Sequence, residues 1–382
     1  MCLGWQTRYE RVHMSLNKTI SSGPLQGVKV IEFAGMGPGP FACMLLSDMG
    51  AEVVRIDRPG ARAANPSDIV GRGRKTLLLD LKLESARTQV LELLTRADAL
   101  VEGFRPRVME RLGLGPEVVA QRNPRLVYGR MTGWGQTGPL AQAAAHDINY
   151  IALSGALAAI GEKSRQPVPP LNLVGDYGGG SLYLVMGILA ALLEARRSGL
   201  GQVVDAAICD GVVSLMSNNQ GHTLRGIYQE ERGSNMLDGG APYYSVYVTS
   251  DGHSVSLGAI ESKFFTLMCE KLELPQSLWN AQNDRARWPQ LKEAIAGSIA
   301  MRSRKEWSRL LEGTDVCFAP VLTLQEAKDH PHIQARKSFI DVDGVTHTAP
   351  APRFSRTPAS INVGAGGETS VDELLVLWTS NV

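Results

Sequence analysis

The sequence predicts an α/β protein in which a large domain carries a Rossmann-like parallel sheet and a smaller domain has an α+β fold. Two observations predict this. In the first half of the chain, short β-branched runs alternate with helix-like runs, which is the βαβ pattern of a parallel sheet. From residue 243 onward the pattern changes to a hairpin followed by helices. The 382 residues are enough for two domains with a core each.

The first βαβ unit lies at residues 28–56. The run VKVIEF at 28–33 is apolar and β-branched and predicts a strand. Residues 41–49 then predict a helix, and 51–56 predict a second strand. This order favours two parallel strands joined by a crossover helix.

The loop between this strand and its helix, GMGPGP at 35–40, allows two interpretations. Asp57, after the second strand, lies about where a dinucleotide-binding fold places the acid that binds the ribose. However, Pro38 and Pro40 have no backbone N–H to offer to a phosphate. We therefore favour a tight turn that lets the helix pack closely over a site for a nicotinamide cofactor.

The alternation continues through the middle of the chain. We expect strands at 76–81, 99–102, 126–131 and 202–208 and helices at 84–97 and from 178 to about 197. The apolar run within the last helix, from Leu182 to Leu193, is shorter than a membrane span and predicts a buried helix. No membrane span is therefore expected.

Three arginines follow the strand at 99–102. Arg105, Arg107 and Arg111 lie in a turn and short helix, where guanidinium groups suit bidentate binding of phosphates. By themselves, three arginines on a loop are more often part of a solvated face. The pattern alone leaves both interpretations open.

Two ionisable side chains border loops in the segment 145–180. His146 directly precedes Asp147, which is placed to cap the helix-like run after it, and Asp176 ends a loop ahead of three glycines. A structural role is the ordinary interpretation of each. Because imidazole titrates near neutral pH and a partly desolvated carboxylate can be tuned towards it, the pair also suits proton transfer at one carbon atom. Backbone N–H groups of the glycines would then stabilise an enolate oxygen.

The smaller domain is expected from the segment 243–261, which alternates like a hairpin with Asp251 and Gly252 at its turn. Helices at 263–272, 288–299 and 304–311 and a strand at 317–322 follow. Glu261 lies at the entrance to the first of these helices. Acidic residues favour a first helical turn, so the helix dipole alone explains this position.

These elements predict the domain organisation. It consists of an extension at 1–23, a large α/β domain at 24–215, a linker at 216–234, a small α+β domain at 235–335 and a return segment to the large domain at 336–382. The chain thus passes twice between the large and the small domain, once on each side of the small domain.

Composition argues against several classes of protein. The 39 basic and 38 acidic residues give a formal net charge of +1, so nucleic acid is not indicated as a partner. The five cysteines are scattered without a C-x-x-C pair, which argues against disulfides or a zinc site and favours a reducing compartment. No metal is expected. Residues 1–23 lack the apolar core of a secretory signal, and we interpret them as a disordered extension, with a transit peptide or a true start at Met14 as alternatives.

Several motifs together resemble one family. They are TGWGQTGP at 132–139, AHDINYIALSG at 145–155, NLVGDYGGG at 172–180, NMLDGGAPYY at 235–244, GAIES at 258–262, QNDRARWP at 282–289 and APRFSRTPAS at 351–360. In this order they closely resemble the α-methylacyl-CoA racemases, which have the family III CoA-transferase fold. The similarity extends from about residue 24 to about residue 360, and the number of separate motifs makes it specific.

The resemblance implies a racemase that interconverts 2R- and 2S-2-methylacyl-CoA thioesters by 1,1-proton transfer through an enolate. His146 and Asp176 match the two acid/base residues, and Glu261 matches a glutamate that orients the histidine. The alternative is a family III CoA-transferase, in which the residue matching Asp176 is a nucleophile. His146, Glu261 and the segment LDGGAPYY favour the racemase. A catalytically silent CoA-binding protein would be expected to lack at least one of the three residues.

The resemblance also implies positions that contact coenzyme A. These are Arg58, Leu79, Asp80, Leu81, Lys82, Gly103, Phe104, Arg105, Arg111, Ala145, Asp147, Asn149 and Tyr150. Coenzyme A is part of the substrate, so no separate cofactor is implied. Members of the family are interlocked homodimers, in which Glu261 of one subunit would act on His146 of the other. We expect a role in fatty acid and lipid metabolism in the cytoplasm, or in mitochondria or peroxisomes if the source is eukaryotic.

Overall fold

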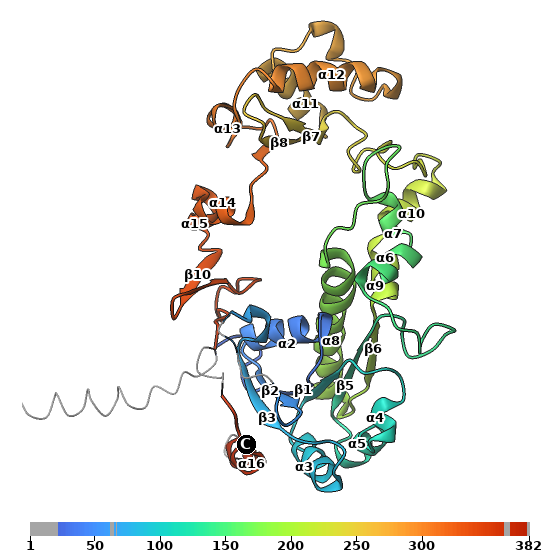
Figure 1. Ribbon diagram of the computed structural model, residues 1–382, viewed down its shortest axis with the longest axis vertical. Coiled ribbons are helices and arrows are strands. Elements are labelled where there is room, and N and C mark those ends of the chain that lie inside the picture. The colour runs from blue at the N-terminus through green and yellow to red at the C-terminus, as the bar shows by residue number, and fades with distance from the viewer. Residues whose placement is uncertain (1–21, 62–64, 66, 363–366, 380–382) are drawn as a thin grey trace, which may run out of the picture. The chain divides into compact units, whose positions relative to one another are not determined.

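The computed structural model describes residues 22–61, 65, 67–362 and 367–379. Residues 1–21 of the predicted extension lie outside the described residues. The chain folds as two compact units (Figure 1). Of the described residues, unit 1 contains those within 22–150, 172–214 and 334–379, and unit 2 contains residues 151–171 and 215–333. The segment 151–171, which the sequence places in the large domain, thus groups with unit 2.

Unit 1 is built on a six-stranded sheet in the order β3-β2-β1-β4-β5-β6. The strands are β1 (Lys29–Phe33), β2 (Glu52–Asp57), β3 (Arg74–Leu78), β4 (Ala99–Glu102), β5 (Val127–Thr132) and β6 (Val203–Ala207). All neighbouring pairs are parallel. Because this is the strand order of a Rossmann fold, the predicted α/β fold class is confirmed.

Helices cover both faces of this sheet. One face packs against α3 (Glu84–Leu94), α4 (Val108–Arg111), α5 (Pro116–Arg122) and α16 (Val371–Thr379), and its core includes Ile31, Leu93 and Trp378. Alternate strand residues point to the opposite face, where α2 (Pro38–Asp48) and α8 (Leu182–Ser198) lie (Figure 1). The missing side chain of Gly129 lets Leu184 and Ile188 of α8 approach β5 closely.

The helix α8 continues a π-helix, η2 (Leu173–Ser181), so the predicted helix starts earlier than expected. Together they form a stretch of 26 residues, Leu173–Ser198, with a mean hydropathy of 1.5, which is long and apolar enough to cross a membrane by length and composition alone. Core helices pass the same test, and α8 packs against β5 and β6. One such helix is weak evidence for a membrane span.

Two buried ion pairs stabilise the end of the sheet near β3. Arg74 Nε donates to Glu32 Oε2 at 2.6 Å, and the same guanidinium donates to the carbonyls of Val70 and Pro40. Arg72 donates to both carboxylate oxygens of Asp48, at 3.0 and 2.5 Å. All four charged side chains are at most 5% exposed. Burial raises the pKa of Asp48, and the hydrogen bond from Arg72 opposes this effect.

The C-terminal segment completes unit 1. Arg72 Nη1 donates to the carbonyl of Thr348 at 2.7 Å, and Lys29 Nζ donates to the carbonyl of Trp378 at 2.9 Å. Thr348 is the last residue of an antiparallel hairpin formed by β10 (Phe339–Val342) and β11 (Val345–Thr348). Residues from both ends of the described chain therefore pack in the same unit.

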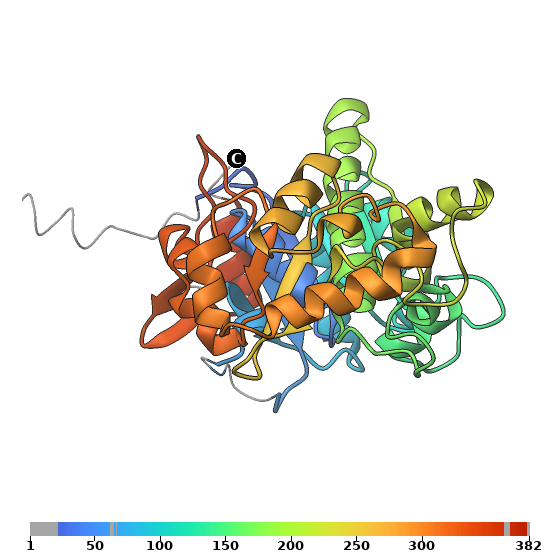
Figure 2. The same cartoon turned by 90° about the horizontal axis from the view of Figure 1, so that it is seen from above.

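Unit 2 contains a three-stranded antiparallel sheet in the order β7-β8-β9. The strands are β7 (Tyr244–Val248), β8 (Ser254–Gly258) and β9 (Phe318–Pro320), and the helices that pack on them are α11 (Ser262–Lys271), α12 (Trp288–Ile299) and α13 (Arg304–Leu311) (Figure 2). The predicted hairpin turn is confirmed, because Gly252 N–H donates to the carbonyl of Thr249 at 3.0 Å. The core includes Phe265, Leu291 and Trp307.

The remaining elements are short. They are η1 (Ile69–Gly71), α6 (Asp147–Leu153), α7 (Ala156–Ala159), α9 (Ile208–Leu215), α10 (Ser217–Leu224), η3 (Gln276–Leu278), η4 (Arg285–Arg287), α14 (Leu324–Asp329) and α15 (Pro331–Ala335). Of these, α6 and α9 adjoin the candidate site in unit 1.

Candidate functional site

Eight of the thirteen positions predicted to contact coenzyme A follow the carboxyl ends of parallel strands. Arg58 follows β2, residues 79–82 follow β3, and residues 103–105 follow β4. In a parallel sheet these ends share one edge, which is where open α/β sheets bind their ligands. Unit 1 thus gathers these positions at one edge of its sheet.

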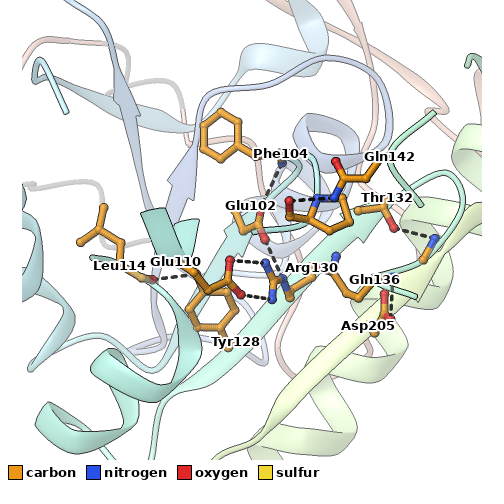
Figure 3. Close-up of polar contacts among 12 residues, drawn as sticks. Glu102, Phe104, Glu110, Leu114, Tyr128, Arg130, Thr132, Gln136, Gln142 and Asp205 are labelled. Atoms are coloured by element: carbon orange, nitrogen blue, oxygen red, sulfur yellow. Dashed lines mark hydrogen bonds and ion pairs between the residues drawn. The ribbon is translucent and has the colours of Figure 1, made fainter. Parts of the chain in front are cut away.

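A network of charged side chains holds the turn after β4 (Figure 3). The Glu102 carboxylate accepts hydrogen bonds from Phe104 N–H at 2.7 Å and from Arg130 Nε at 2.9 Å. The other nitrogens of Arg130 donate to both carboxylate oxygens of Glu110, at 2.8 and 3.2 Å. These hydrogen bonds lower the pKa of Glu110, whereas burial raises the pKa of Glu102. The network therefore ties Phe104 and the helix α4, which carries Arg111, to β5.

The loop that leads to His146 is fastened at several points. Gln142 Nε2 donates to the carbonyl of Pro106 at 3.2 Å, so this loop is joined to the turn after β4. Gln136 N–H donates to Asp205 Oδ2 at 3.0 Å (Figure 3). Near the end of the loop, the Tyr150 hydroxyl donates to the carbonyl of Ala145 at 2.7 Å. This fastening fixes the chain on both sides of His146.

His146 lies at the N-cap position of α6. Its carbonyl accepts a hydrogen bond from Asn149 N–H at 2.8 Å, and Asn149 Oδ1 accepts one from His146 N–H at 3.1 Å. The prediction that Asp147 caps this helix is therefore wrong. Asp147 is the first helical residue, and its carboxylate bonds to another segment. The His146 side chain is exposed.

Asp176 lies inside η2 rather than at the end of a loop. Its neighbours Gly178 to Gly180 are also within this π-helix, where backbone N–H groups bond along the helix to the residue five positions earlier. Tyr177 N–H, for example, donates to the carbonyl of Asn172 at 3.2 Å. The glycines therefore do not present free donors at a helix start, and that source of enolate stabilisation was predicted wrongly. Their small size instead admits the neighbouring Ile208 and Val212.

The Asp176 carboxyl is half-buried in a polar cluster of unit 1. Burial raises its pKa, and the negative charge of Asp147 adds to this increase. A hydrogen bond from Asn172 and the charge of His146 act in the opposite direction. The net effect is a pKa above that of an ordinary aspartate, which suits a group that must both take and return a proton near neutral pH.

Gly37, in the turn between β1 and α2, brings the backbone close to this carboxyl. Its φ of 69° is in the left-handed region, and a Cβ atom there would lie 3.1 Å from Asp176 Oδ2. The turn around GMGPGP thus packs against the candidate catalytic residue. Pro38 is at the first position of α2, which a proline tolerates because its missing N–H has no helical partner there.

The structure argues against a dinucleotide site at this turn, because the Asp57 carboxylate that would bind the ribose is already hydrogen-bonded. Asp57 Oδ2 accepts from Arg55 Nη2 at 2.6 Å, and Asp57 Oδ1 accepts from Arg58 N–H at 2.8 Å. Because both oxygens are engaged by the chain itself, Asp57 is a structural residue and the tight turn is the better interpretation.

Glu261 belongs to unit 2. It is the N-cap residue of α11, with φ of −73° and ψ of 140°, and its side chain makes no capping hydrogen bond. The carboxylate is exposed and therefore available to another partner. Burial raises the pKa of the nearby Cys317 thiol, and the negative charge of Glu261 adds to this increase.

Sequence reasoning missed the roles of Arg130 and Glu110 and the contact between Asp147 and Asp176. A usable signal existed for Arg130, since Arg130 and Glu102 interrupt otherwise apolar buried strands and opposite charges in such places pair. In the described part of the chain, no group of three or more His, Cys, Asp or Glu residues is placed to hold a metal ion.

Comparisons with known proteins agree on one family. Residues 25–365 match CoA-transferase family III. The chain is 45% identical to the mouse (Mus musculus) alpha-methylacyl-CoA racemase, over 88% of this chain and 87% of the relative, and 43% identical to the human (Homo sapiens) protein of the same name over the same shares. A crystal structure of Rv3272 from M. tuberculosis is similar with a TM-score of 0.77 and 26% identity, covering 93% of this chain and 99% of that chain.

Proposed function

The chain belongs to CoA-transferase family III, and we propose that within this family it is a racemase of 2-methylacyl-CoA thioesters. The observation that carries this function is the hydrogen bond of 2.6 Å from Asp176 N–H to Oδ1 of Asp147, the residue next to His146, which joins the segments of the two candidate acid/base residues in unit 1. Two acid/base groups beside one another suit removal of a proton from one face of a carbon and return of a proton to the other. The names of the 45% and 43% identical relatives support the same activity.

The proposed reaction starts from the α-hydrogen of the thioester. His146 takes the proton of the 2S form, an enolate forms, and Asp176 delivers a proton to the opposite face to give the 2R form. The reverse reaction exchanges the two roles. Acid/base groups alone supply this chemistry, so we propose no cofactor besides the coenzyme A of the substrate.

Proton NMR of a single enantiomer in deuterated water tests the function. Loss of the α-proton signal together with inversion of the carbon is the expected result. The alternative is a CoA-transferase in which the Asp176 carboxylate attacks the thioester and carries the acyl group covalently. Transfer of CoA to an added carboxylic acid, without exchange of the α-proton, would establish that alternative.

We propose that the thirteen predicted CoA positions in unit 1 bind the coenzyme and that the braced turn after β4 contributes to this binding. Support comes from the place of eight of them, Arg58, residues 79–82 and residues 103–105, at the carboxyl edge of the sheet. Glu110→Ala removes one half of the Arg130 brace, and its side chain is 42% exposed. We expect the Kd for coenzyme A to rise roughly fivefold, or about 1 kcal/mol, in a calorimetric titration.

Glu117→Ala, in the first turn of the neighbouring α5, is the matched control for this change. It removes a carboxylate from the same region without removing a partner of Arg130. Equal weakening by both substitutions would show that general surface charge matters and that the brace does not.

We also propose that the protein acts as a homodimer in which Glu261 orients His146 of the partner subunit. The unused carboxylate of Glu261 at the start of α11 supports this role. Glu261→Ala is expected to lower kcat on the order of 10-fold to 100-fold, by analogy with other groups that orient a histidine, while coenzyme A binds as before. An equal loss of binding and turnover would contradict an orienting role.

The cellular compartment and the pathway of the enzyme follow from its proposed substrate class. We propose that it works in the cytoplasm in fatty acid or other lipid metabolism, since its substrate class is branched acyl thioesters. Fractionation of cells that express the tagged full-length chain tests the compartment.

A further inference from the structure

One hydrogen bond joins the two candidate acid/base segments. Asp147 Oδ1 accepts from the backbone N–H of Asp176 at 2.6 Å. Asp147 is the residue directly after His146 and the first residue of α6. Asp147 is therefore adjacent in the chain to His146, and its carboxylate is hydrogen-bonded to the backbone of Asp176.

This contact also uses a donor that a helix leaves unpaired. Asp176 lies in the first turn of η2, where backbone N–H groups have no partner within the helix. Because a carboxylate accepting such an N–H is a charge-assisted bond, it fixes the first turn of η2 more strongly than a neutral acceptor would. The side chain of Asp176 projects from this fixed turn.

The charged and titratable groups around the Asp176 carboxyl come from three elements. Asp147 and His146 act on it from the start of α6, and Tyr150 lies further along the same helix. Burial raises the pKa of Tyr150, and Asp176, Cys209 at the start of α9 and Asp147 add to this increase. Asn172, next to η2, donates a hydrogen bond to Asp176. Asp147 is thus the group whose negative charge opposes ionisation of Asp176.

We propose that Asp147 is a positioning residue of the racemase, which holds the Asp176 segment at a fixed place beside His146 through its hydrogen bond to Asp176 N–H. The negative charge of Asp147 also favours the protonated form of Asp176. The inference rests on the proposed function for its kinetic consequences but on the structure for its contacts. A two-base transfer needs both groups at a fixed separation with one proton shared between them, and Asp147 meets both needs. This positioning role of Asp147 differs from its predicted role as a contact to coenzyme A.

Two substitutions separate the geometric and electrostatic parts. Asp147→Asn keeps the Oδ1 acceptor but removes the charge, whereas Asp147→Ala removes both. Loss of the positioning bond is expected to lower kcat of the alanine variant on the order of 100-fold with KM little changed, because small displacements of a catalytic group have effects of this size. The asparagine variant is expected to recover most of this kcat.

The pH profile gives the second readout. The pair is active when it carries one proton, so kcat/KM follows a bell whose acid limb reports ionisation of Asp176. Removing the negative charge of Asp147 lowers the pKa of Asp176, so the acid limb of Asp147→Asn moves to lower pH. The shift must be the same for both enantiomers, since their equilibrium fixes the ratio of the two kcat/KM values.

Asp205→Asn is the matched control, because Asp205 also holds a backbone N–H, that of Gln136, with its carboxylate. This variant is expected to leave the acid limb in place. A direct measurement is ¹³C NMR titration of Asp176 in full-length protein labelled at aspartate, with assignment from Asp176→Asn. A lower pKa of Asp176 in Asp147→Asn is expected whatever reaction the enzyme performs.

The outcomes are distinct. An unchanged Asp176 titration and an increase in KM without loss of kcat in Asp147→Ala would overturn the positioning role and make Asp147 a coenzyme A contact. If wild-type protein fails to exchange the α-proton but the titration still shifts, the proposed racemase function fails and the positioning of Asp176 stands.

Discussion

Replacing His146 with alanine is expected to lower the rate of inversion on the order of 10²-fold to 10⁴-fold, the usual contribution of a general acid/base. Exchange of the α-proton should then depend on the enantiomer. The 2S form loses the base that faces it, so its α-proton signal persists in deuterated water. The 2R form still faces Asp176 and exchanges its proton slowly, without inversion.

Asp176→Asn is the mirror experiment. Here the 2S form is expected to exchange and the 2R form to keep its α-proton, because only His146 remains. His253→Ala, which removes an exposed histidine at the hairpin turn of unit 2, is the control and should leave both rates unchanged. Equal loss of exchange for both enantiomers in both variants would rule out two separate bases and favour one residue that acts on both faces.

Replacing Glu32 with alanine is expected to reduce the free energy of unfolding by about 3–5 kcal/mol. This is the usual effect of removing one partner of a buried ion pair, because the other charge stays buried without compensation. Glu32 and Arg74 are 1% and 2% exposed, so water cannot replace the lost carboxylate. Urea denaturation followed by circular dichroism measures the change.

Glu52→Ala is the matched control, since Glu52 also pairs with a cation on β3. Its partner is Lys75, at 3.4 Å, and the two side chains are 28% and 33% exposed. Such a solvated pair contributes about 0–1 kcal/mol. Similar losses in both variants would show that the Arg74 charge is solvated when its partner is removed.

The parallel sheet could be predicted because its signal is local. The runs VKVIEF and AEVVRI are β-branched and apolar, and strands buried on both faces require this composition. Predicted and observed boundaries differ at α2, where Pro38 and Pro40 both belong to the first turn of the helix. Prolines mark both turns and helix starts, and only packing decides between them.

The geometry around Asp176 could not be predicted from local signals. Three glycines favour a helix start, but they lie within a π-helix, where Gly179 and Gly180 pack against Val212 and Ile208, about thirty residues later in the chain. In the same way, Asp147 has the sequence of a helix cap, and its partner is 29 positions away. The resemblance to a family identified which residues to examine, but their contacts required the fold.

The division of unit 1 into three chain segments has a consequence for folding during synthesis. The first 150 residues contain β1 to β5, but β6 emerges from the ribosome only after residue 207. The carbonyls of Thr348 and Trp378, which accept hydrogen bonds from Arg72 and Lys29, follow only after the whole of unit 2 has been made. Because domains generally fold as units, N-terminal first, unit 1 must wait in an incomplete state with its last contacts open. Unit 2 begins later in the chain, but its synthesis is complete before that of unit 1. If the newly made enzyme depends on chaperones, this dependence would therefore originate in unit 1.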